Sequence, residues 1–354
     1  MTKAELDNRK ILPLEDSWYR RVKEKLDGIA KPLDGLGKFE HLIAQIGAIE
    51  KTTKISIQKK AVLVMCADNG VVEEQVSQSG KEVTLAVAKA MGVNNSSVGK
   101  MAAVAGVDVI PVDIGIDTDE VIPGVLPRKV AKGTKNFAKE PAMTEEEVLK
   151  AIETGIQLVQ QCHREGYEIL ATGEMGIGNT TTSTAVAAAL LDLEVELVTG
   201  KGAGLTDEAL KRKCRVIEEA IEKYSLRDAD AFTILKTVGG LDIAGLTGVF
   251  IGAAIEQIPV VIDGVISAVA ALLAETLCKG AVNYMIPSHK SRELAETAIM
   301  KKLHLDPVLD ADMALGEGTG AVMMMSLLDV ALGVYLQGAS FANFEIEQYK
   351  RYEE

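Results

Sequence analysis

A glycine-rich segment after an apolar run carries the first residues able to do chemistry. It reads ATGEMGIGNTTTSTAVAAALL and passes into an Ala-rich, helical stretch. Glycines let the backbone approach a ligand closely, and free amides at a helix start attract a phosphate or carboxylate. The spacing fits neither a Walker loop nor a dinucleotide fingerprint, so it predicts either a tight turn with a good helix cap or an anion site. The residues of that site would be Gly176, Ile177, Gly178, Asn179 and Thr180.

A second glycine-rich turn, VTGKGAGLTDEALKRK, contains Gly202 and precedes a helix with Thr206 as its cap. Leu205 and Leu210 have the spacing of a hydrophobic staple across the start of that helix. Lys213 flanks the apolar row of the same helix. Its long side chain indicates either a solvated boundary residue or a cation that reaches back to the turn and neutralises a phosphate.

A third segment, LGEGTGA, places Glu317 between two glycines in apolar surroundings. Neighbouring cations are scarce there, so the pKa of this carboxyl should be raised toward the range useful for accepting a proton. The alternative is a glutamate that caps a helix at a turn. The residue types alone leave both interpretations open.

Other polar residues follow the apolar runs. Asp68, Asp242 and Asp263 are each able to cap a loop or to orient a ribose or a catalytic partner. Ser291, in PSHKSRE, stands before a helix, where its hydroxyl would hold phosphate oxygens or act as a plain cap. His289 has no Asp and Ser partners at triad-like positions, which argues against a hydrolase base.

Four short apolar runs, at 61–67, 107–114, 168–174 and 258–264, are typical of strands covered on both faces. Helical stretches lie between them, one beginning at Thr144 with acids in its first turn. Strand alternating with helix predicts a parallel sheet, whose ligands gather at the carboxyl ends of the strands. The first fifty residues form two amphipathic helices, and the closing AVMMMSLLDVALGVYL is apolar nearly all round, which predicts burial.

Composition limits the function classes. The chain has 354 residues, 47% apolar content, and 38 basic against 51 acidic residues, which argues against nucleic-acid binding. The first ten residues lack an apolar signal core, and Asp263 and Gly264 interrupt the longest apolar stretch. We therefore expect a cytoplasmic protein without a membrane span. Four scattered cysteines form no CxxC pair, so they indicate a reduced compartment and no metal site.

Nine segments together resemble the nicotinate-nucleotide dimethylbenzimidazole phosphoribosyltransferase family along nearly the whole chain. They occur in that family's order and read KPLDGLGKFE, ADNGV, VSQSGKEVT, GEMGIGNTT, GKGAGL with its following lysine, VGGLDIAGL, VIDGV, PSHKSRE and LGEGTGA. The resemblance implies a Rossmann-like doubly wound parallel sheet in a large domain (56–290). A small helical domain would combine both chain ends (1–55 and 291–354).

The resemblance also implies roles for individual residues. Glu317 matches the family's general base and Glu174 its second active-site acid. Gly176, Lys213 and Ser291 match positions that hold the phosphate of nicotinate mononucleotide. The partners would be that mononucleotide and an aromatic base, in a homodimer with a composite active site, without cofactor or metal. The acceptor pocket would include Ser79, Val87 and Leu315.

Two departures from the family concern the acceptor. Many members read DHG where this chain has Asp68, Asn69 and Gly70. Val87 stands where well-studied members have a glutamine that lines the acceptor pocket. A subunit of a heterodimer that uses phenol or cresol therefore stays open as an alternative to dimethylbenzimidazole transfer. A non-catalytic nucleotide-binding subunit is the alternative from a different class, and it would be expected if Glu317 or the phosphate loops were degenerate, whereas here they are intact.

Overall fold

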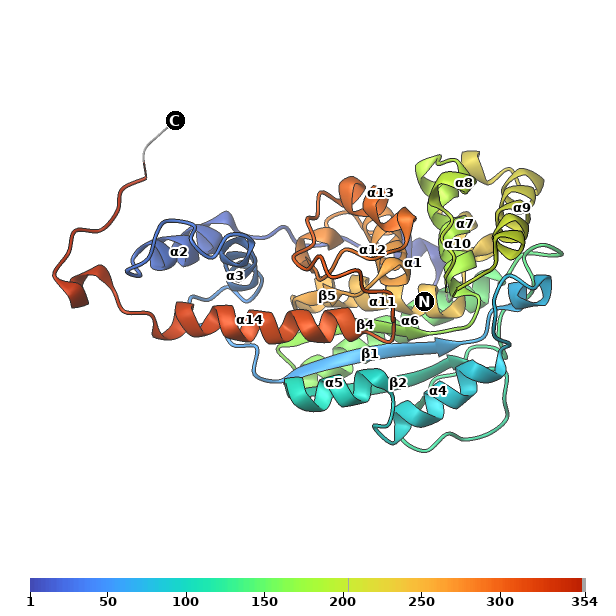
Figure 1. The fold of residues 1–354 in the computed structure, drawn as a ribbon, viewed down its shortest axis with the longest axis horizontal. Coiled ribbons are helices and arrows are strands. Elements are labelled where there is room, and N and C mark those ends of the chain that lie inside the picture. The colour runs from blue at the N-terminus through green and yellow to red at the C-terminus, as the bar shows by residue number, and fades with distance from the viewer. Residues whose placement is uncertain (203, 352–354) are drawn as a thin grey trace.

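A six-stranded parallel sheet forms the centre of the protein (Figure 1). The computed structural model describes residues 1–202 and 204–351. The strand order is β3-β2-β1-β4-β5-β6. The strands are β1 (Lys60–Ala67), β2 (Val107–Gly115), β3 (Leu126–Pro127), β4 (Ile169–Met175), β5 (Val260–Ile262) and β6 (Met285–Pro287). This is the doubly wound order, and it confirms the predicted α/β class. The four predicted strands are present, whereas β3 and β6 are short and lie outside the apolar runs that predicted the others.

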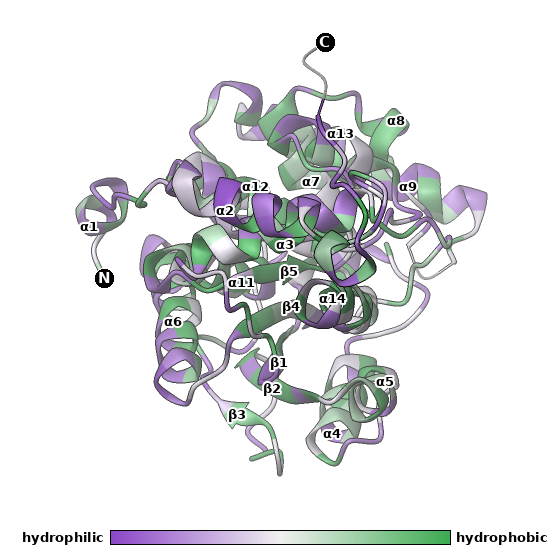
Figure 2. Ribbon diagram, turned by 90° about the vertical axis from the view of Figure 1, so that its left-hand side faces the viewer, coloured by the Kyte–Doolittle hydropathy of each residue, from purple (hydrophilic) through white to green (hydrophobic). Residues whose placement is uncertain are grey.

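The apolar residues of β1 explain why both faces of the sheet are covered. Leu63 and Met65 belong to one apolar cluster, and Val62 and Val64 belong to a second. Successive side chains of a strand point to opposite faces, so a continuous apolar run needs helices on each side. Figure 2 shows the hydrophobic strands in the middle of the molecule.

Helices α6 (Glu145–Arg164) and α11 (Leu241–Glu256) pack against each other on one face of the sheet. Thr144 forms a capping box with Glu147 at the start of α6, as the acids of that turn predict. Helices α4 (Glu82–Gly92), α5 (Ser97–Ala105) and α14 (Thr319–Gln337) contribute to the apolar cluster on the other face. The remaining α-helices are α1 (Lys3–Asp7), α2 (Asp16–Asp27), α3 (Lys38–Ile49), α7 (Asn179–Leu191), α8 (Val195–Val198), α9 (Asp207–Lys223), α10 (Ala231–Val238), α12 (Val265–Leu277) and α13 (Leu294–Leu303).

Helix α14 differs from the prediction that it is buried all round. Its inner residues pack on the sheet, but Val330 is 74% exposed and Leu336 is 49% exposed. The helix is long and apolar enough to cross a membrane by length and composition alone, and 56% of its most apolar window is buried. Contacts with strands β4 and β5 are those of a core helix that keeps one apolar face uncovered.

The terminal helices α2 and α3 lie at one end of the molecule, beside α14 (Figure 1). Their apolar residues, including Val22 and Ile43, form one continuous cluster with α14 and with Val62 of the sheet. The division into a small and a large domain stays a prediction.

Candidate active site

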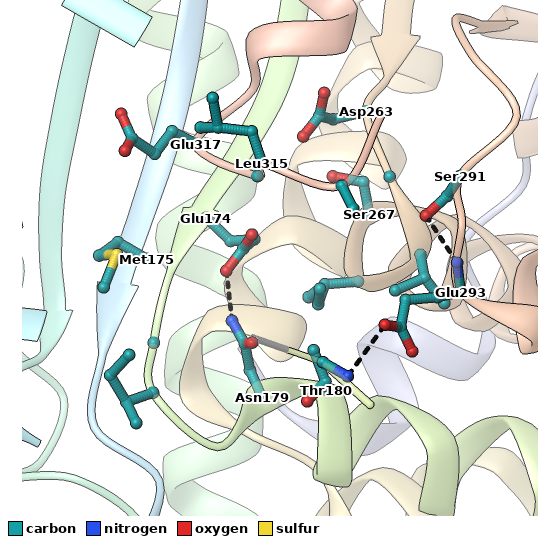
Figure 3. A pocket seen from close by; sticks show the side chains of 18 of the residues that line it. Glu174, Met175, Asn179, Thr180, Asp263, Ser267, Ser291, Glu293, Leu315 and Glu317 are labelled. Carbon is teal, nitrogen blue, oxygen red and sulfur yellow. Dashed lines mark hydrogen bonds between the residues drawn. The ribbon is translucent and has the colours of Figure 1, made fainter. Parts of the chain in front are cut away.

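A cavity of about 290 Å³ opens where β4, β5 and β6 end (Figure 3). A crevice at the carboxyl ends of parallel strands is the expected place for a ligand in this architecture. Of the predicted site residues, those that line it are Val87, Glu174, Gly176, Ile177, Asn179, Thr180, Gly202, Asp263, Ser291, Leu315 and Glu317. Segments far apart in the sequence therefore meet at one ligand-sized space.

The turn that carries Glu317 has an unusual backbone. Three successive residues have positive φ: +86° at Gly316, +61° at Glu317 and +90° at Gly318. A Cβ at Gly173 of the adjacent strand would lie 2.5 Å from the Glu317 carbonyl oxygen, so only glycine lets the turn sit this close. The Glu317 carboxylate accepts a hydrogen bond of 3.0 Å from the backbone amide of Val98, in the first turn of α5. The fold thus holds this carboxylate at the cavity wall.

Asp263 holds the same turn in place through hydrogen bonds. Its carboxylate accepts hydrogen bonds from the backbone amides of Gly318 (3.2 Å), Gly320 (2.9 Å) and Ala321 (3.1 Å) at the start of α14. Burial raises the pKa of Asp263, and these amides oppose that rise. Asp263 therefore fixes the helix that begins two residues after Glu317.

Glu174 is the second acid of the cavity and lies against the Glu317 turn. A Cβ at Gly316 would be 2.7 Å from Glu174 Oε1. The Asn179 side-chain amide donates to Glu174 and, at 3.1 Å, to Asp242 behind it. Burial raises the pKa of Glu174 to about 8 and that of Asp242 to about 6. Glu174 is consequently mostly protonated at neutral pH. The acid beside it, Glu317, is accessible to solvent.

The opposite end of the cavity is polar. Gly202 donates its amide hydrogen to Glu293 at 3.1 Å, and the Ser291 hydroxyl accepts from the Glu293 amide at 3.2 Å (Figure 3). Lys213 is fully buried behind this wall and does not line the cavity itself. Its ammonium donates to Thr180 Oγ1 and to the Gly200 carbonyl, each at 3.1 Å. Burial lowers the pKa of Lys213 to about 8.

Helix α7 starts at this end, but most of its first-turn amides are engaged within the protein. Asn179 donates to the Gly176 carbonyl at 3.0 Å, and Thr181 donates to the Gly178 carbonyl at 2.9 Å. The Ile177 amide donates to Thr84 Oγ1 at 3.2 Å. A ligand at this loop would therefore be held by few backbone amides.

Several predicted residues lie outside the cavity lining. Gly178 is the cap residue before α7, with φ +93°. Asp68 accepts from the Asp117 amide at 2.8 Å, and the Ser79 amide donates to Ser77 Oγ at 3.3 Å. Asp242 supports the site through Asn179 rather than by facing the space.

One group of acids in the described part of the chain is close enough to share a metal ion, and it comprises Asp27, Asp34 and Glu40. It belongs to the α2–α3 region, not to the cavity. Lys23 bonds both Asp34 and Glu40, and Arg351 pairs with Asp27 and Asp34. These ion pairs account for the acids without a metal.

Comparison with known proteins gives a consistent result. A phosphoribosyltransferase family model matches residues 11–346. The nicotinate-nucleotide–dimethylbenzimidazole phosphoribosyltransferase of Acetivibrio thermocellus is 45% identical and covers 93% of this chain and 94% of its own length. That of Clostridium acetobutylicum is 43% identical over 95% of this chain and 96% of its own. The crystal structure of CobT from Thermus thermophilus superposes with a TM-score of 0.89 at 34% identity, covering 94% of this chain and 100% of that one.

The chain belongs to this phosphoribosyltransferase family. Membership confirms the resemblance seen in the nine motifs.

In this family member, sequence reasoning missed part of the cavity wall. The missed lining residues are Met175, Gly264, Val265, Ile266, Ser267, His289, Glu293, Ala314 and Gly316. Helix α12 follows β5 after a two-residue turn, so the pattern of an apolar run followed by Asp263 and Gly264 was a usable signal. Glu293 offered no such signal, because its partner Gly202 lies 91 residues away in the chain.

Proposed function

We propose that this enzyme transfers the 5-phosphoribosyl group from nicotinate mononucleotide to 5,6-dimethylbenzimidazole or a related base. The products are alpha-ribazole 5′-phosphate, used in the lower ligand of cobalamin, and nicotinate. The observation that carries the proposal is the Glu317 carboxylate, held on a left-handed turn at the wall of a cavity whose other end is polar. The relatives from Acetivibrio thermocellus and Clostridium acetobutylicum are named for this reaction, which supports the proposal.

The chemistry requires a base and no acid at the leaving group. One imidazole nitrogen of the acceptor attacks the anomeric carbon of the ribose. The bond from that carbon to nicotinate breaks, and its electron pair neutralises the pyridinium nitrogen. The other imidazole nitrogen then loses its proton to Glu317, the general base. Glu174, with a pKa of about 8, stays protonated and uncharged near Glu317. It therefore does not compete with Glu317 for the proton of the acceptor.

The polar end would hold the mononucleotide phosphate. Gly202, Thr180 and Ser291 line the space, and Lys213 supplies a positive charge directly behind Thr180. A phosphate fixed there orients the anomeric carbon toward the acceptor, which is where most of the rate acceleration should arise.

The acceptor would lie beside apolar side chains. Val87, Met175 and Leu315 line the cavity, Met175 and Leu315 on the side of Glu317 (Figure 3), and Leu315 is 53% exposed. An apolar wall suits a flat aromatic base. It also suits a phenol, so a phenol or cresol transferase that works with a second subunit is the alternative.

Exposed apolar side chains and free cysteines bear on assembly and location. A homodimer in which the partner helps to close the site is supported by apolar residues left exposed on α14, including Val330 and Leu336. A cytoplasmic location is supported by four cysteines that are all free.

The decisive experiment incubates the purified protein with nicotinate mononucleotide and a panel of benzimidazoles, purines and phenols, and identifies products by mass spectrometry. We expect dimethylbenzimidazole to give the phosphoribosyl product and free nicotinate. A phenolic product, or activity only after a second chain is added, would favour the alternative. No transfer to any acceptor would refute the proposed function.

A further inference from the structure

Glu293 uses its carboxylate in an unexpected way. It is the N-cap residue of α13, yet its side chain makes no cap hydrogen bond with that helix. An acidic side chain near a helix start can interact with the free amides of that helix. Here the carboxylate points away from its own helix and accepts a hydrogen bond of 3.1 Å from the backbone amide of Gly202 (Figure 3).

The glycine turn is shaped around this carboxylate. A Cβ on Gly200 would lie 1.9 Å from Glu293 Oε2, so the carboxylate would have to move aside for any larger residue. Gly202 has φ +52°, a conformation that favours glycine. The two glycines thus form a small recess in which one anionic group is already seated.

The same recess carries the groups that would bind the mononucleotide phosphate. Lys213 donates to the Gly200 carbonyl and to Thr180 Oγ1, and the Ser291 hydroxyl accepts from the Glu293 amide. Burial lowers the pKa of Lys213, and the nearby negative charge of Glu293 opposes that change. A phosphate entering the recess would find the Gly202 amide occupied and a negative charge beside it.

We propose that Glu293 is an anionic placeholder that sets the phosphate affinity of the site. Its carboxylate occupies the Gly200–Gly202 turn in the free enzyme and leaves when the mononucleotide phosphate binds. The inference rests on the proposed function for the location of that phosphate. It adds a residue that determines specificity, acting by competition rather than by attraction.

The physical reason is charge. A free amide turn next to the Lys213 ammonium would bind any small anion of the cell, including inorganic phosphate. A tethered carboxylate competes with each of them equally. A mononucleotide overcomes this competition because its ribose and ring make further contacts, whereas a bare anion cannot.

Isothermal titration of inorganic phosphate, nicotinate mononucleotide and nicotinate riboside tests the proposal. We expect Glu293→Gln and Glu293→Ala to bind inorganic phosphate about tenfold more tightly than the parent, a change of about 1.4 kcal/mol. The alanine variant is included because glutamine retains an oxygen that could still accept from Gly202. Nicotinate riboside, which has no phosphate, should bind with unchanged affinity.

A matched control is Glu208→Gln, which removes the same charge from an exposed position in the first turn of α9. It should leave all three affinities unaltered. The gain in the Glu293 variants should shrink at high salt, of the order of 0.5 M, because the Debye length then falls to a few ångströms. A variant that merely damages the fold would lose affinity, so tighter binding cannot arise from misfolding.

Weaker or equal binding of inorganic phosphate in both Glu293 variants would overturn the placeholder. A loss of nicotinate riboside affinity in the same variants would indicate instead that Glu293 contacts the ribose or the ring. The transfer assay with the parent enzyme keeps the two proposals apart. If the parent transfers phosphoribose while the Glu293 variants bind phosphate less well, only the placeholder fails. If the parent gives no transfer, the function itself fails.

Discussion

The two ends of the cavity are built on opposite physical principles. At the Glu317 end, a carboxyl group lies near the apolar side chains of Met175 and Leu315, and a left-handed turn fixes the backbone. At the Gly202 end, polar groups engage one another, and the cation Lys213 is buried behind the surface. The Glu317 end positions a reactive group. At the Gly202 end, the polar and charged groups of the protein interact with one another when no ligand is bound.

This contrast indicates where sensitivity to substitution should lie. The Glu317 end depends on one carboxylate whose chemistry cannot be shared. The Gly202 end would hold the ligand through several weak contacts. Removing one of these contacts should therefore reduce ligand affinity less than removing Glu317 reduces turnover.

The largest effect is expected for Glu317→Gln. Glutamine keeps the shape but cannot accept the proton of the acceptor, so turnover should fall about 10²- to 10⁴-fold while mononucleotide affinity stays near normal. Steady-state kinetics and a binding titration measure the two quantities. Asp310→Asn, an exposed acid of the same segment, serves as the control. Parental turnover in Glu317→Gln would place the base elsewhere and remove the contrast between the ends.

A smaller effect is expected for Lys213→Ala. Loss of a charge-assisted contact is worth about 1.5–3 kcal/mol, so nicotinate mononucleotide should bind roughly ten- to 150-fold more weakly. Lys211→Ala, which is exposed on the same helix, should bind as the parent does. Unchanged affinity in a Lys213→Ala titration would exclude this lysine from the phosphate end.

The pH dependence of binding tests the same end of the cavity. Lys213 has a pKa of about 8 in the free protein, so raising the pH above 8 removes the charge that attracts phosphate. Mononucleotide affinity should fall by up to about tenfold per pH unit above 8. The effect on folding has the opposite sign: between about 8 and the ordinary 10.5 the native state binds fewer protons than the unfolded chain, so this group's contribution to stability rises with pH. Titration calorimetry at pH 7, 8 and 9 measures the mononucleotide affinity. Equal affinities at the three pH values would show that Lys213 is not involved.

The smallest effect concerns Val87. An apolar wall cannot reject a base by leaving a polar group unpaired, so the parent should discriminate among flat aromatic acceptors only about ten- to 200-fold. Val87→Gln should increase the preference for dimethylbenzimidazole several-fold, whereas Ala86→Gln, one residue away and exposed, should not. Competition between paired acceptors gives the ratio directly. Identical ratios in parent and Val87→Gln would mean that position 87 does not face the acceptor.

The sequence predicted the central part of the fold well because its strands are buried on both faces. The run 61–67 became β1 almost residue for residue. Strand β5 is equally short but lies in the longer apolar run 258–264, whereas β6 lies in no such run and depends on pairing with β5. Helix α14 was expected to be buried on all sides, but hydropathy alone does not reveal which face a neighbour covers.

The site was predictable where residues act within one turn, as at Gly316, Glu317 and Gly318. Prediction failed where a contact joins distant segments. Nothing in the local sequence indicates that Glu293 bonds to Gly202, or that Asp263 binds the amides of α14. Such pairs are set by the packing of the sheet and its helices, which only the three-dimensional structure provides.

The hydrogen bonds of Asp263 to the first amides of α14 hold only one end of a long helix. Nineteen residues at 1.5 Å each make this helix about 28 Å long. Asp263 fixes the end next to Glu317, whereas the Gln337 end lies the whole length of the helix away from the reactive carboxylate. A protein that covered the exposed Val330 and Leu336 would therefore contact the part of α14 that is distant from Glu317.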